Sequence, residues 1–226
     1  SNGINDIIVT RDSIWIGMGR GLSLTLDNGK SWKHFSNTLT FDEKGSSALA
    51  VRGNEIWAAT AYSVKSDNEN IPTGHGLHYS ADNGNTWHFI TQPVDTGTVD
   101  TLVYGNNKIR ALAVPIPQGN VTFDIALTNN AVWIASWYGM LRKSTDKGKT
   151  WRRVILPPDA RQEIKPTDTL DFDLSPSAGK LGLRENLNHL VFTVYASNDS
   201  TIWVGTAGGI NKSTDGGVSW RKFTHQ

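Results

Sequence analysis

Four copies of one short pattern recur along the chain, and this repeat restricts the fold more than any other feature of the sequence. Each copy reads Ser or Thr, any residue, Asp, any residue, Gly, any residue, Ser or Thr, and Trp. An apolar run that contains a Trp precedes every copy, so two landmarks recur together and indicate four repeats of one supersecondary structure. The copies occupy residues 25–32, 80–87, 144–151 and 213–220, and the preceding tryptophans are Trp15, Trp57, Trp133 and Trp203.

The short pattern predicts a tight hairpin turn between two strands. A short Asp side chain accepts hydrogen bonds from backbone N–H groups within a turn, and Gly adopts a positive φ without a Cβ clash. The Trp begins the next strand, where its indole packs against the turn and buries a large apolar area. We therefore assign a structural role to the Asp, Gly and Trp of each copy, namely Asp27, Gly29, Trp32, Asp82, Gly84, Trp87, Asp146, Gly148, Trp151, Asp215, Gly217 and Trp220.

Each repeat reads as four short strands separated by Asn, Asp and Gly. The spacing between landmarks differs among the repeats, and the differences locate three loop insertions, at residues 62–74, 91–119 and 157–187. Without them about 41 residues remain per repeat, which is the size of one four-stranded propeller blade. The sequence thus predicts one segment over residues 1–226, with blades at 4–36, 46–91, 120–156 and 188–224.

The pattern resembles the Asp-box, or bacterial neuraminidase, repeat of β-propellers that include sialidases, sortilin-type receptors, xyloglucanases and photosystem II assembly factors. The resemblance covers nearly the whole chain and implies an all-β propeller of four-stranded antiparallel blades, with four Asp-box blades in this chain as part of a larger ring. The stretches from Trp133 to Trp151 and from Trp203 to Trp220, which contain residues 139–144 and 209–213, are also similar to repeats of large exported bacterial propeller proteins. That similarity implies an extracellular, periplasmic or cell-surface location.

A sialidase would carry further motifs that this chain lacks. The resemblance leads us to expect an Arg-Ile-Pro or similar motif near the start of such an enzyme, an arginine triad for the substrate carboxylate, and a Tyr-Glu nucleophile pair. The chain has Val114-Pro115-Ile116-Pro117 and no such arginine motif. We therefore carry over no catalytic residue, and the Asp-box indicates architecture rather than chemistry.

The composition argues against several classes of function. With 22 Lys and Arg against 21 Asp and Glu, the chain has no general field that would draw it to nucleic acid or to an anionic membrane. No run of 18 apolar residues occurs, so we expect no membrane-spanning helix. The chain has no Cys and its six His lack zinc-binding spacing, so we expect no metal and no cofactor. His75 and His78, three positions apart in a strand-like run, should point to opposite faces.

Strand direction predicts where the insertions emerge. In a four-stranded meander, the connection between strands two and three leaves the sheet on the same side as the connection to the next blade. The Asp-box turn joins strands three and four on the opposite side. All three insertions belong to the first class, so the sequence predicts one elaborated face that carries the functional loops.

One aromatic pair on that face is our candidate binding site. Trp137 is the single Trp of nine outside the two landmarks, and with Tyr138 it enters the turn between strands two and three of the third repeat. An exposed pair there would stack on a sugar or anchor a protein partner, with Arg20, Tyr62 and Arg161 nearby. The competing interpretation is that the indole packs beneath a neighbouring insertion.

The sequence leaves three functional hypotheses. The first is a non-catalytic propeller that acts as a rigid interaction platform of an exported or surface protein, with a glycan or protein partner and association with further blades or a second copy. The second is a glycoside hydrolase or lyase that uses carboxylates of the acidic loop at 159–173, although a solvated loop with turn caps accounts for the same residues. The third is a purely structural arc of a larger propeller.

Overall fold

The computed structural model describes residues 3–35, 41, 44–67, 69–177 and 180–224, which form an all-β chain with two short 3-10 helices. Position 36, a predicted blade boundary, and position 68 of the first insertion lie outside the described residues. Within the described part, no helix is long and apolar enough to cross a membrane. The chain divides into two compact units: unit 1 comprises residues 1–93 and 117–127, and unit 2 comprises residues 94–116 and 128–226.

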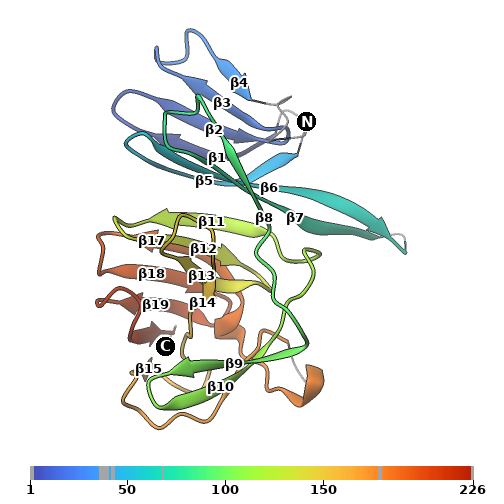
Figure 1. Cartoon of the computed structure of the whole chain (residues 1–226), viewed down its shortest axis with the longest axis vertical. Helices are drawn as coiled ribbons and strands as arrows, with labels where there is room; N and C mark the ends of the chain where they lie inside the picture. Colours follow the sequence, from blue (N-terminus) through green and yellow to red (C-terminus); the bar gives the residue numbers. More distant parts are fainter. Residues whose placement is uncertain (1–2, 36–40, 42–43, 68, 178–179, 225–226) are drawn as a thin grey trace. The chain divides into compact units, whose positions relative to one another are not determined.

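Unit 1 contains two four-stranded antiparallel sheets (Figure 1). Each strand pairs with its neighbours in the sequence, because the turns between them are short. The first sheet comprises β1 (Ile4–Val9), β2 (Ile14–Met18), β3 (Leu22–Thr25) and β4 (Lys33–Phe35). The second comprises β5 (Gly45–Arg52), β6 (Glu55–Ser66), β7 (Glu69–Ser80) and β8 (His88–Thr91), and the unit also includes β11 (Thr122–Leu127).

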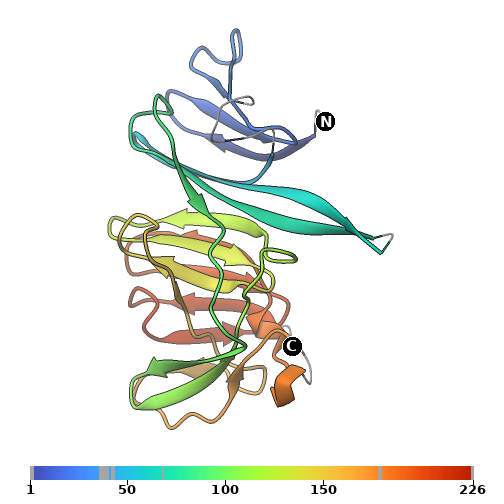
Figure 2. The ribbon, with the colours of Figure 1, turned by 45° about the vertical axis from the view of Figure 1, so that its right-hand side comes forward.

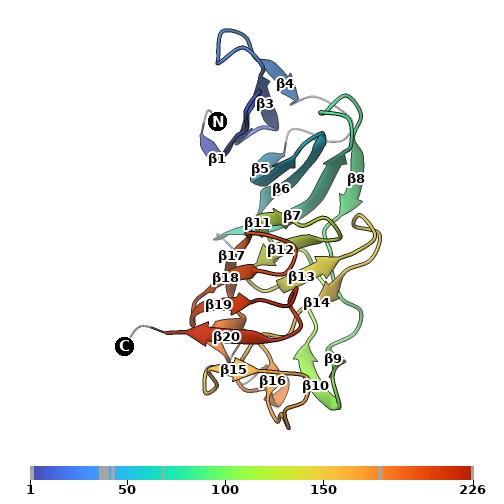
Figure 3. The ribbon, with the colours of Figure 1, turned by 90° about the vertical axis from the view of Figure 1, so that its left-hand side faces the viewer.

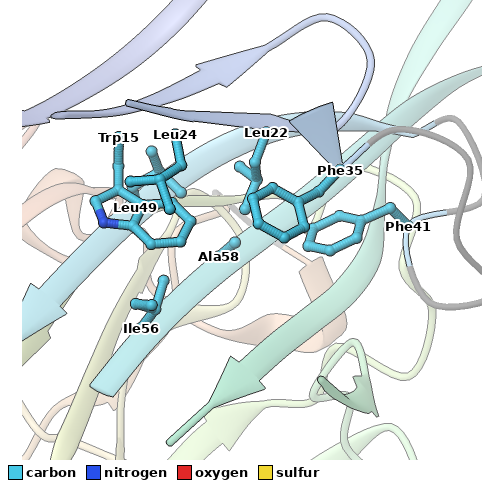
Figure 4. Packing of buried hydrophobic residues seen from close by; sticks show 8 residues of the cluster. All are labelled: Trp15, Leu22, Leu24, Phe35, Phe41, Leu49, Ile56 and Ala58. Atoms are coloured by element: carbon cyan, nitrogen blue, oxygen red, sulfur yellow. The ribbon is translucent and has the colours of Figure 1, made fainter. Parts of the chain in front are cut away.

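The core of unit 1 joins its two sheets. Trp15 of β2 is 2% exposed and stacks on Phe35 of β4, with ring centroids 5.8 Å apart. Figure 4 shows these rings beside Leu49 of β5 and Ile56 of β6, which approach from the second sheet. Full burial of a large apolar side chain stabilises a fold by about 1.5–3 kcal/mol, so this cluster holds the sheets face to face. Its buried members are Trp15, Leu22, Leu24, Phe35, Phe41, Leu49, Ile56 and Ala58.

The insertion at 62–74 is a β-hairpin rather than a loop. β6 and β7 continue to pair as far as Ser66 and Glu69, beyond the last residues that pair with β5 and β8 (Figure 2). Asp67 lies between the two strands with a positive φ of 44°. Pro72 is tolerated because its backbone faces away from β6, where its carbonyl accepts a 2.8 Å hydrogen bond from the Gly119 amide, so the ladder with β6 loses no hydrogen bond.

Unit 2 contains the strands of the third and fourth repeats. β12 (Val132–Ser136), β13 (Met140–Ser144) and β14 (Arg152–Arg153) are successive antiparallel neighbours. The last sheet has the order β15-β20-β19-β18-β17, so the third insertion adds a fifth strand beside β20 (Figure 3). Its strands are β15 (Glu163–Ile164), β17 (Val191–Ala196), β18 (Ile202–Thr206), β19 (Gly209–Ser213) and β20 (Trp220–Phe223).

The second and third insertions form a small sheet of their own in unit 2. β9 (Val99–Tyr104) and β10 (Asn107–Leu112) make an antiparallel hairpin, and β16 (Asp173–Leu174) pairs parallel to β10. An ion pair of 2.9 Å between Arg110 Nε and Asp173 Oδ1 joins the same two strands. The third insertion also contains the 3-10 helices η1 (Lys180–Gly182) and η2 (Leu187–His189).

The prediction that all insertions stay on one face is wrong for unit 2. The Tyr104 hydroxyl, near the tip of the β9–β10 hairpin, donates a 2.7 Å hydrogen bond to the Val218 carbonyl inside the last Asp-box turn. The third insertion accompanies this tip, because the Asn107 amide donates to the Asp168 carbonyl at 2.8 Å. Six residues of strand span about 20 Å, which matches the length of β17, the longest blade strand of unit 2. The exit point of an insertion therefore does not confine its tip to that side.

Candidate functional site

The four Asp-box turns have the same internal hydrogen bonds. In the third repeat, Asp146 accepts bonds from the Ser144 hydroxyl (2.8 Å), the Thr150 amide (2.9 Å) and the Thr150 hydroxyl (2.6 Å). These bonds, that of the Thr150 hydroxyl above all, lower the pKa of Asp146 to about 2. The Gly148 amide donates to the Ser144 hydroxyl, which completes the turn. Each box carboxylate is thus occupied within its own turn, as Asp27, Asp82 and Asp215 are.

Trp137 and Tyr138 lie together in the turn between β12 and β13. Met140 begins β13 with a positive φ of 61°, at a position where the other repeats have Gly. The Trp137 ring packs edge to face on Phe192 of β17, with centroids 4.8 Å apart, and is partly buried. Tyr138 and Phe192 are 41% and 38% exposed. The structure therefore places three aromatic rings at one surface, which we call the aromatic turn (Trp137, Tyr138 and Phe192).

The sequence analysis missed Phe192, because it belongs to the next repeat and its partner is 55 positions away. The sequence of β17 alternates like that of any half-buried strand, so it did not indicate that Phe192 belongs to a surface with Trp137. A register irregularity between Val191 and Thr193 changes the face of the sheet to which the side chains point. Only the packing of β17 beside β12 brings the ring to the turn.

Buried charged side chains fix the backbone of the aromatic turn. Arg142 Nε donates a 3.2 Å hydrogen bond to the Gly139 carbonyl, and its Nη2 lies 2.9 Å from Asp95 Oδ1. The two side chains are only 4% and 8% exposed. Arg153 Nη2 lies 3.4 Å from the same Asp95 and 2.8 Å from Asp100. Burial lowers the pKa of Arg142, while the charge of Asp95 acts in the opposite direction. The second insertion thus supplies the carboxylate that fixes the turn.

Arg20 and Tyr62 lie in unit 1, around Lys44. The Lys44 ammonium is 4.7 Å from the centre of the Tyr62 ring, which is 38% exposed. Arg20 is exposed in the turn between β2 and β3, and the amide of the following Gly21 donates to the Lys44 carbonyl at 2.9 Å. Lys44 was missed because a single Lys outside the repeated landmarks carries no sequence signal.

His75 and His78 lie on one face, contrary to the sequence prediction. The Thr60 hydroxyl is 3.1 Å from His75 Nδ1 and 3.0 Å from His78 Nε2. The register of β6 and β7 shifts between Thr60 and Ala61, and this β-bulge reverses the alternation of side chains. Burial, and next the charge of His75, lower the pKa of His78 to about 3. His78 is therefore a neutral, buried residue.

Arg161 folds back on its own insertion. Its backbone amide donates to the Pro158 carbonyl at 3.0 Å, and its Nη2 donates to the Thr169 carbonyl at 3.2 Å. The structure therefore places Trp137 and Tyr138 side by side and links both the turn at Arg20 and the Tyr62 ring to Lys44, whereas Arg161 supports the third insertion.

The carboxylates of the acidic loop have local partners. Asp159 accepts the amides of Leu187 and Asn188, both at 2.8 Å. Burial alone would raise the pKa of Asp173, but its hydrogen bond from Arg110 and its other bonds lower it. A general acid in glycoside hydrolysis needs a raised pKa instead. Over the part of the chain that is described, no group of three or more His, Asp or Glu side chains could hold a metal ion.

A cavity of about 500 Å³ lies beside the Asp-box turns of unit 2. Its walls include Tyr104, Lys143, Asp146 and Arg152. Lys143 is already engaged, because its ammonium donates to the Gly216 carbonyl at 3.0 Å. Since Asp146 is also committed to its turn, the cavity offers few uncommitted polar groups to a ligand.

The chain is similar to parts of larger proteins, although no protein-family model matches it. A curated sialidase of Bacteroides fragilis (strain YCH46) is 29% identical over 165 residues, covering 66% of this chain and 29% of that protein. The crystal structure of an ancestral GH74 enzyme covers 100% of this chain with a TM-score of 0.57 and 17% identity. PorZ, a surface component of the type-IX secretion system of Porphyromonas gingivalis, covers 94% with a TM-score of 0.50 and 13% identity.

This chain spans 24% of the GH74 enzyme and 26% of PorZ, well under two thirds of any of these proteins. At such identities the solved structures establish the fold alone. The recurring box, its hydrogen bonds and the consecutive antiparallel sheets agree with that fold. The chain is built of Asp-box β-propeller repeats.

Proposed function

We propose that this chain is a non-catalytic propeller segment that serves as a rigid interaction platform, with Trp137 and Tyr138 as its contact residues. Its four repeats are four blades of a larger ring, and the Asp, Gly and Trp of each box are structural. The observation that carries the proposal is an aromatic surface fixed from below by the buried Arg142–Asp95 pair.

The physical basis is preorganisation. Binding is weakened when side chains and loops must be ordered, at about 0.5–1.5 kcal/mol per immobilised side chain. Phe192 and Arg142 hold the turn at Trp137 in place, so folding has already ordered much of this surface before a partner binds. Aromatic rings of this kind stack on sugar faces and anchor protein interfaces. The partner is accordingly a glycan or a protein surface.

A location outside the cytoplasm supports the same function. PorZ, whose fold this chain shares, is described as a bacterial surface component. The chain spans about a quarter of that protein, which supports the view that its blades are part of a larger assembly. We propose an extracellular, periplasmic or cell-surface location and a larger ring.

A glycan array tests the platform. The wild type, Trp137→Ala and Tyr195→Ala would be compared, because Tyr195 is an aromatic residue that is 63% exposed and is not one of the three rings of the aromatic turn. We expect binding to a subset of glycans that falls about tenfold or more in Trp137→Ala, a loss of about 1.4 kcal/mol, and is retained in Tyr195→Ala. Equal binding by all three proteins would show that Trp137 is not a contact residue. If none of the three proteins bound any glycan, a glycan partner would be excluded and a protein would be the partner that the proposal retains.

Glycoside hydrolysis is the second candidate, because the Bacteroides fragilis relative is named a sialidase and the GH74 structure is an enzyme. The local partners of Asp159, Asp168 and Asp173 argue against it. A panel of fluorogenic aryl glycosides, including a sialoside, distinguishes the two. Our proposal requires no turnover above that of the buffer, and hydrolysis that is lost in Asp173→Asn would favour the enzyme.

A further inference from the structure

The aromatic turn is built from two uncharged segments of neighbouring repeats. Residues 129–141, which include Trp137 and Tyr138, contain no Asp, Glu, Lys or Arg, and the same holds for residues 186–198, which include Phe192. The one histidine of these segments, His189, is fully buried. Burial lowers the pKa of His189 to about 4, so this side chain is neutral at pH 7. The two segments therefore bring no charge to the surface of the turn.

The charged pair that fixes the turn is not accessible to a ligand. Arg142 Nη2 lies 2.9 Å from Asp95 Oδ1, and the two side chains are only 4% and 8% exposed. Recognition of a carboxylate or phosphate relies on a guanidinium or ammonium group that the ligand can approach. Arg142 could serve an anionic ligand only if Asp95 were left buried and unpaired, which is costly. The turn is therefore poorly suited to an anion.

Two hydrogen-bond donors of the turn are unused by the fold. Among the described residues, neither the indole N–H of Trp137 nor the hydroxyl of Tyr138 has a hydrogen-bond partner, and their contacts are ring contacts. The box tryptophans behave differently, because their indoles donate to the carbonyl of the box Gly: Trp87, Trp151 and Trp220. The aromatic turn thus combines exposed rings with free donors at their edges.

The exposed aromatic surface is small, because the apolar side chains that flank it in the chain are buried. Tyr138 and Phe192 are 41% and 38% exposed, whereas Met140, Val191 and Val194 are at most 3% exposed. A stable protein interface buries about 800 Å² on each partner. Three aromatic side chains of about 150–250 Å² each, already partly covered, provide much less than that. Their area matches one or two sugar rings better than a protein surface.

A neutral pyranose has the chemistry that this surface lacks. Its ring presents C–H groups on one face, and these pack on the electron-rich face of an aromatic ring. The hydroxyls at its edge accept hydrogen bonds from donors such as an indole N–H or a phenol. A carboxylate on the sugar would instead lose its water on this surface without a cation to replace it.

We infer that the aromatic turn binds neutral hexopyranosyl glycans and discriminates against sialylated and uronic-acid glycans. The sugar ring stacks on the exposed aromatic rings, while Trp137 Nε1 and the Tyr138 hydroxyl donate to its hydroxyls. This inference rests on the proposed function and names the class of ligand at the same surface. It is independent of the number of blades in the complete ring, because neighbouring repeats of this chain supply all three rings.

A glycan array of matched pairs tests the class of ligand. Each pair presents one oligosaccharide with and without a terminal sialic acid, or one oligogalacturonide as the methyl ester and as the free acid. We expect the neutral member to bind at least about tenfold more tightly than its acidic partner. Calorimetric titration with the strongest neutral glycan should give affinities that differ by less than about twofold between roughly 50 and 500 mM NaCl, because no ion pair contributes.

A pair of matched substitutions tests the hydrogen bond from Tyr138. Tyr138→Phe retains the ring and removes the hydroxyl, and Tyr195→Phe makes the same change at a Tyr that is 63% exposed and outside the aromatic turn. We expect Tyr138→Phe to weaken binding of the neutral glycan by about three- to tenfold, and Tyr195→Phe to bind like the wild type. Circular dichroism confirms that both variants are folded.

The possible failures of the inference and of the platform are distinguishable. Tighter binding of the acidic glycans that is lost in Trp137→Ala, or full affinity in Tyr138→Phe, would overturn the inference and leave the platform intact. Binding of neutral glycans that is unchanged in Trp137→Ala would overturn both, because the sugar would then bind elsewhere. Failure to bind any glycan would overturn the inference and leave the platform with a protein partner.

Discussion

At the scale of single residues, the buried pair of Arg142 and Asp95 is the most sensitive point of unit 2. Their side chains are 4% and 8% exposed, and Arg153 also lies against Asp95. Removal of one partner leaves an uncompensated buried charge, which costs about 3–5 kcal/mol. We expect Asp95→Asn to lower the free energy of unfolding by about that amount in urea titrations. It should also loosen the aromatic turn, because Arg142 holds Gly139.

Asp171→Asn is the matched control for this change. The Asp171 side chain is fully exposed, and its carboxylate lies 3.7 Å from Arg184. An exposed ion pair contributes about 0–1 kcal/mol, so this variant should unfold nearly as the wild type does. Comparable decreases in the free energy of unfolding in Asp95→Asn and Asp171→Asn would show that the buried pair of Arg142 and Asp95 stabilises unit 2 no more than an exposed ion pair does.

At the scale of elements, the contact between neighbouring sheets depends on the box Gly. Gly29 and Gly217 both have a positive φ, 86° and 87°, so Ala costs backbone strain of about 1 kcal/mol at either site. Only at Gly217 would the new Cβ also meet Trp133, at 2.5 Å. Overpacking of this kind costs about 1–3 kcal/mol more. We expect Gly217→Ala to be the more destabilising by that difference in urea unfolding.

Equal destabilisation by the two substitutions would mean that the strand Trp moves aside without cost. The contact between Gly217 and Trp133 would then not be a rigid one.

The same scale shows what the sequence could and could not predict. The Asp-box turns and the strands around them were predictable, because Asp, Gly and Trp act within eight residues of one another. The pairing of β16 with β10 was not, because it joins segments more than 60 positions apart and no local pattern records such a partner. The single-face prediction failed for the same reason at Tyr104. Trp137 was predictable as an outlier among the tryptophans, whereas Arg142 below it looked like an ordinary strand residue.

At the scale of the whole molecule, we expect acid to destabilise the fold first through histidine. Burial lowers the pKa of His78 in unit 1 to about 3 and that of His189 in unit 2 to about 4, against 6.5 when unfolded. Below pH 6.5 the unfolded chain therefore binds protons that the folded chain does not, and stability falls with pH. At pH 5 each histidine costs about 2 kcal/mol.

Urea midpoints measured between pH 4 and pH 8 check this expectation. The decrease of the urea midpoint with falling pH should be shallower in His78→Gln and in His189→Gln than in the wild type. It should be the same as in the wild type in His88→Gln, whose side chain is exposed. The Asp-box carboxylates have pKa values lowered to about 2 at Asp27, Asp82 and Asp146, so their contribution is lost only below about pH 3.8. A decline that begins only below pH 4 would contradict the role of the histidines.

The pairing of β10 with β16 also has an evolutionary consequence. Deletion of the third insertion would expose one edge of β10 and leave Arg110 without Asp173, and deletion of the second would leave Asp173, 4% exposed, buried without Arg110. We therefore expect the two insertions to be inherited together, although blade strands separate them in the chain. Natural homologues should keep or lose both together, and a lineage that retains just one would have to supply a substitute guanidinium or strand.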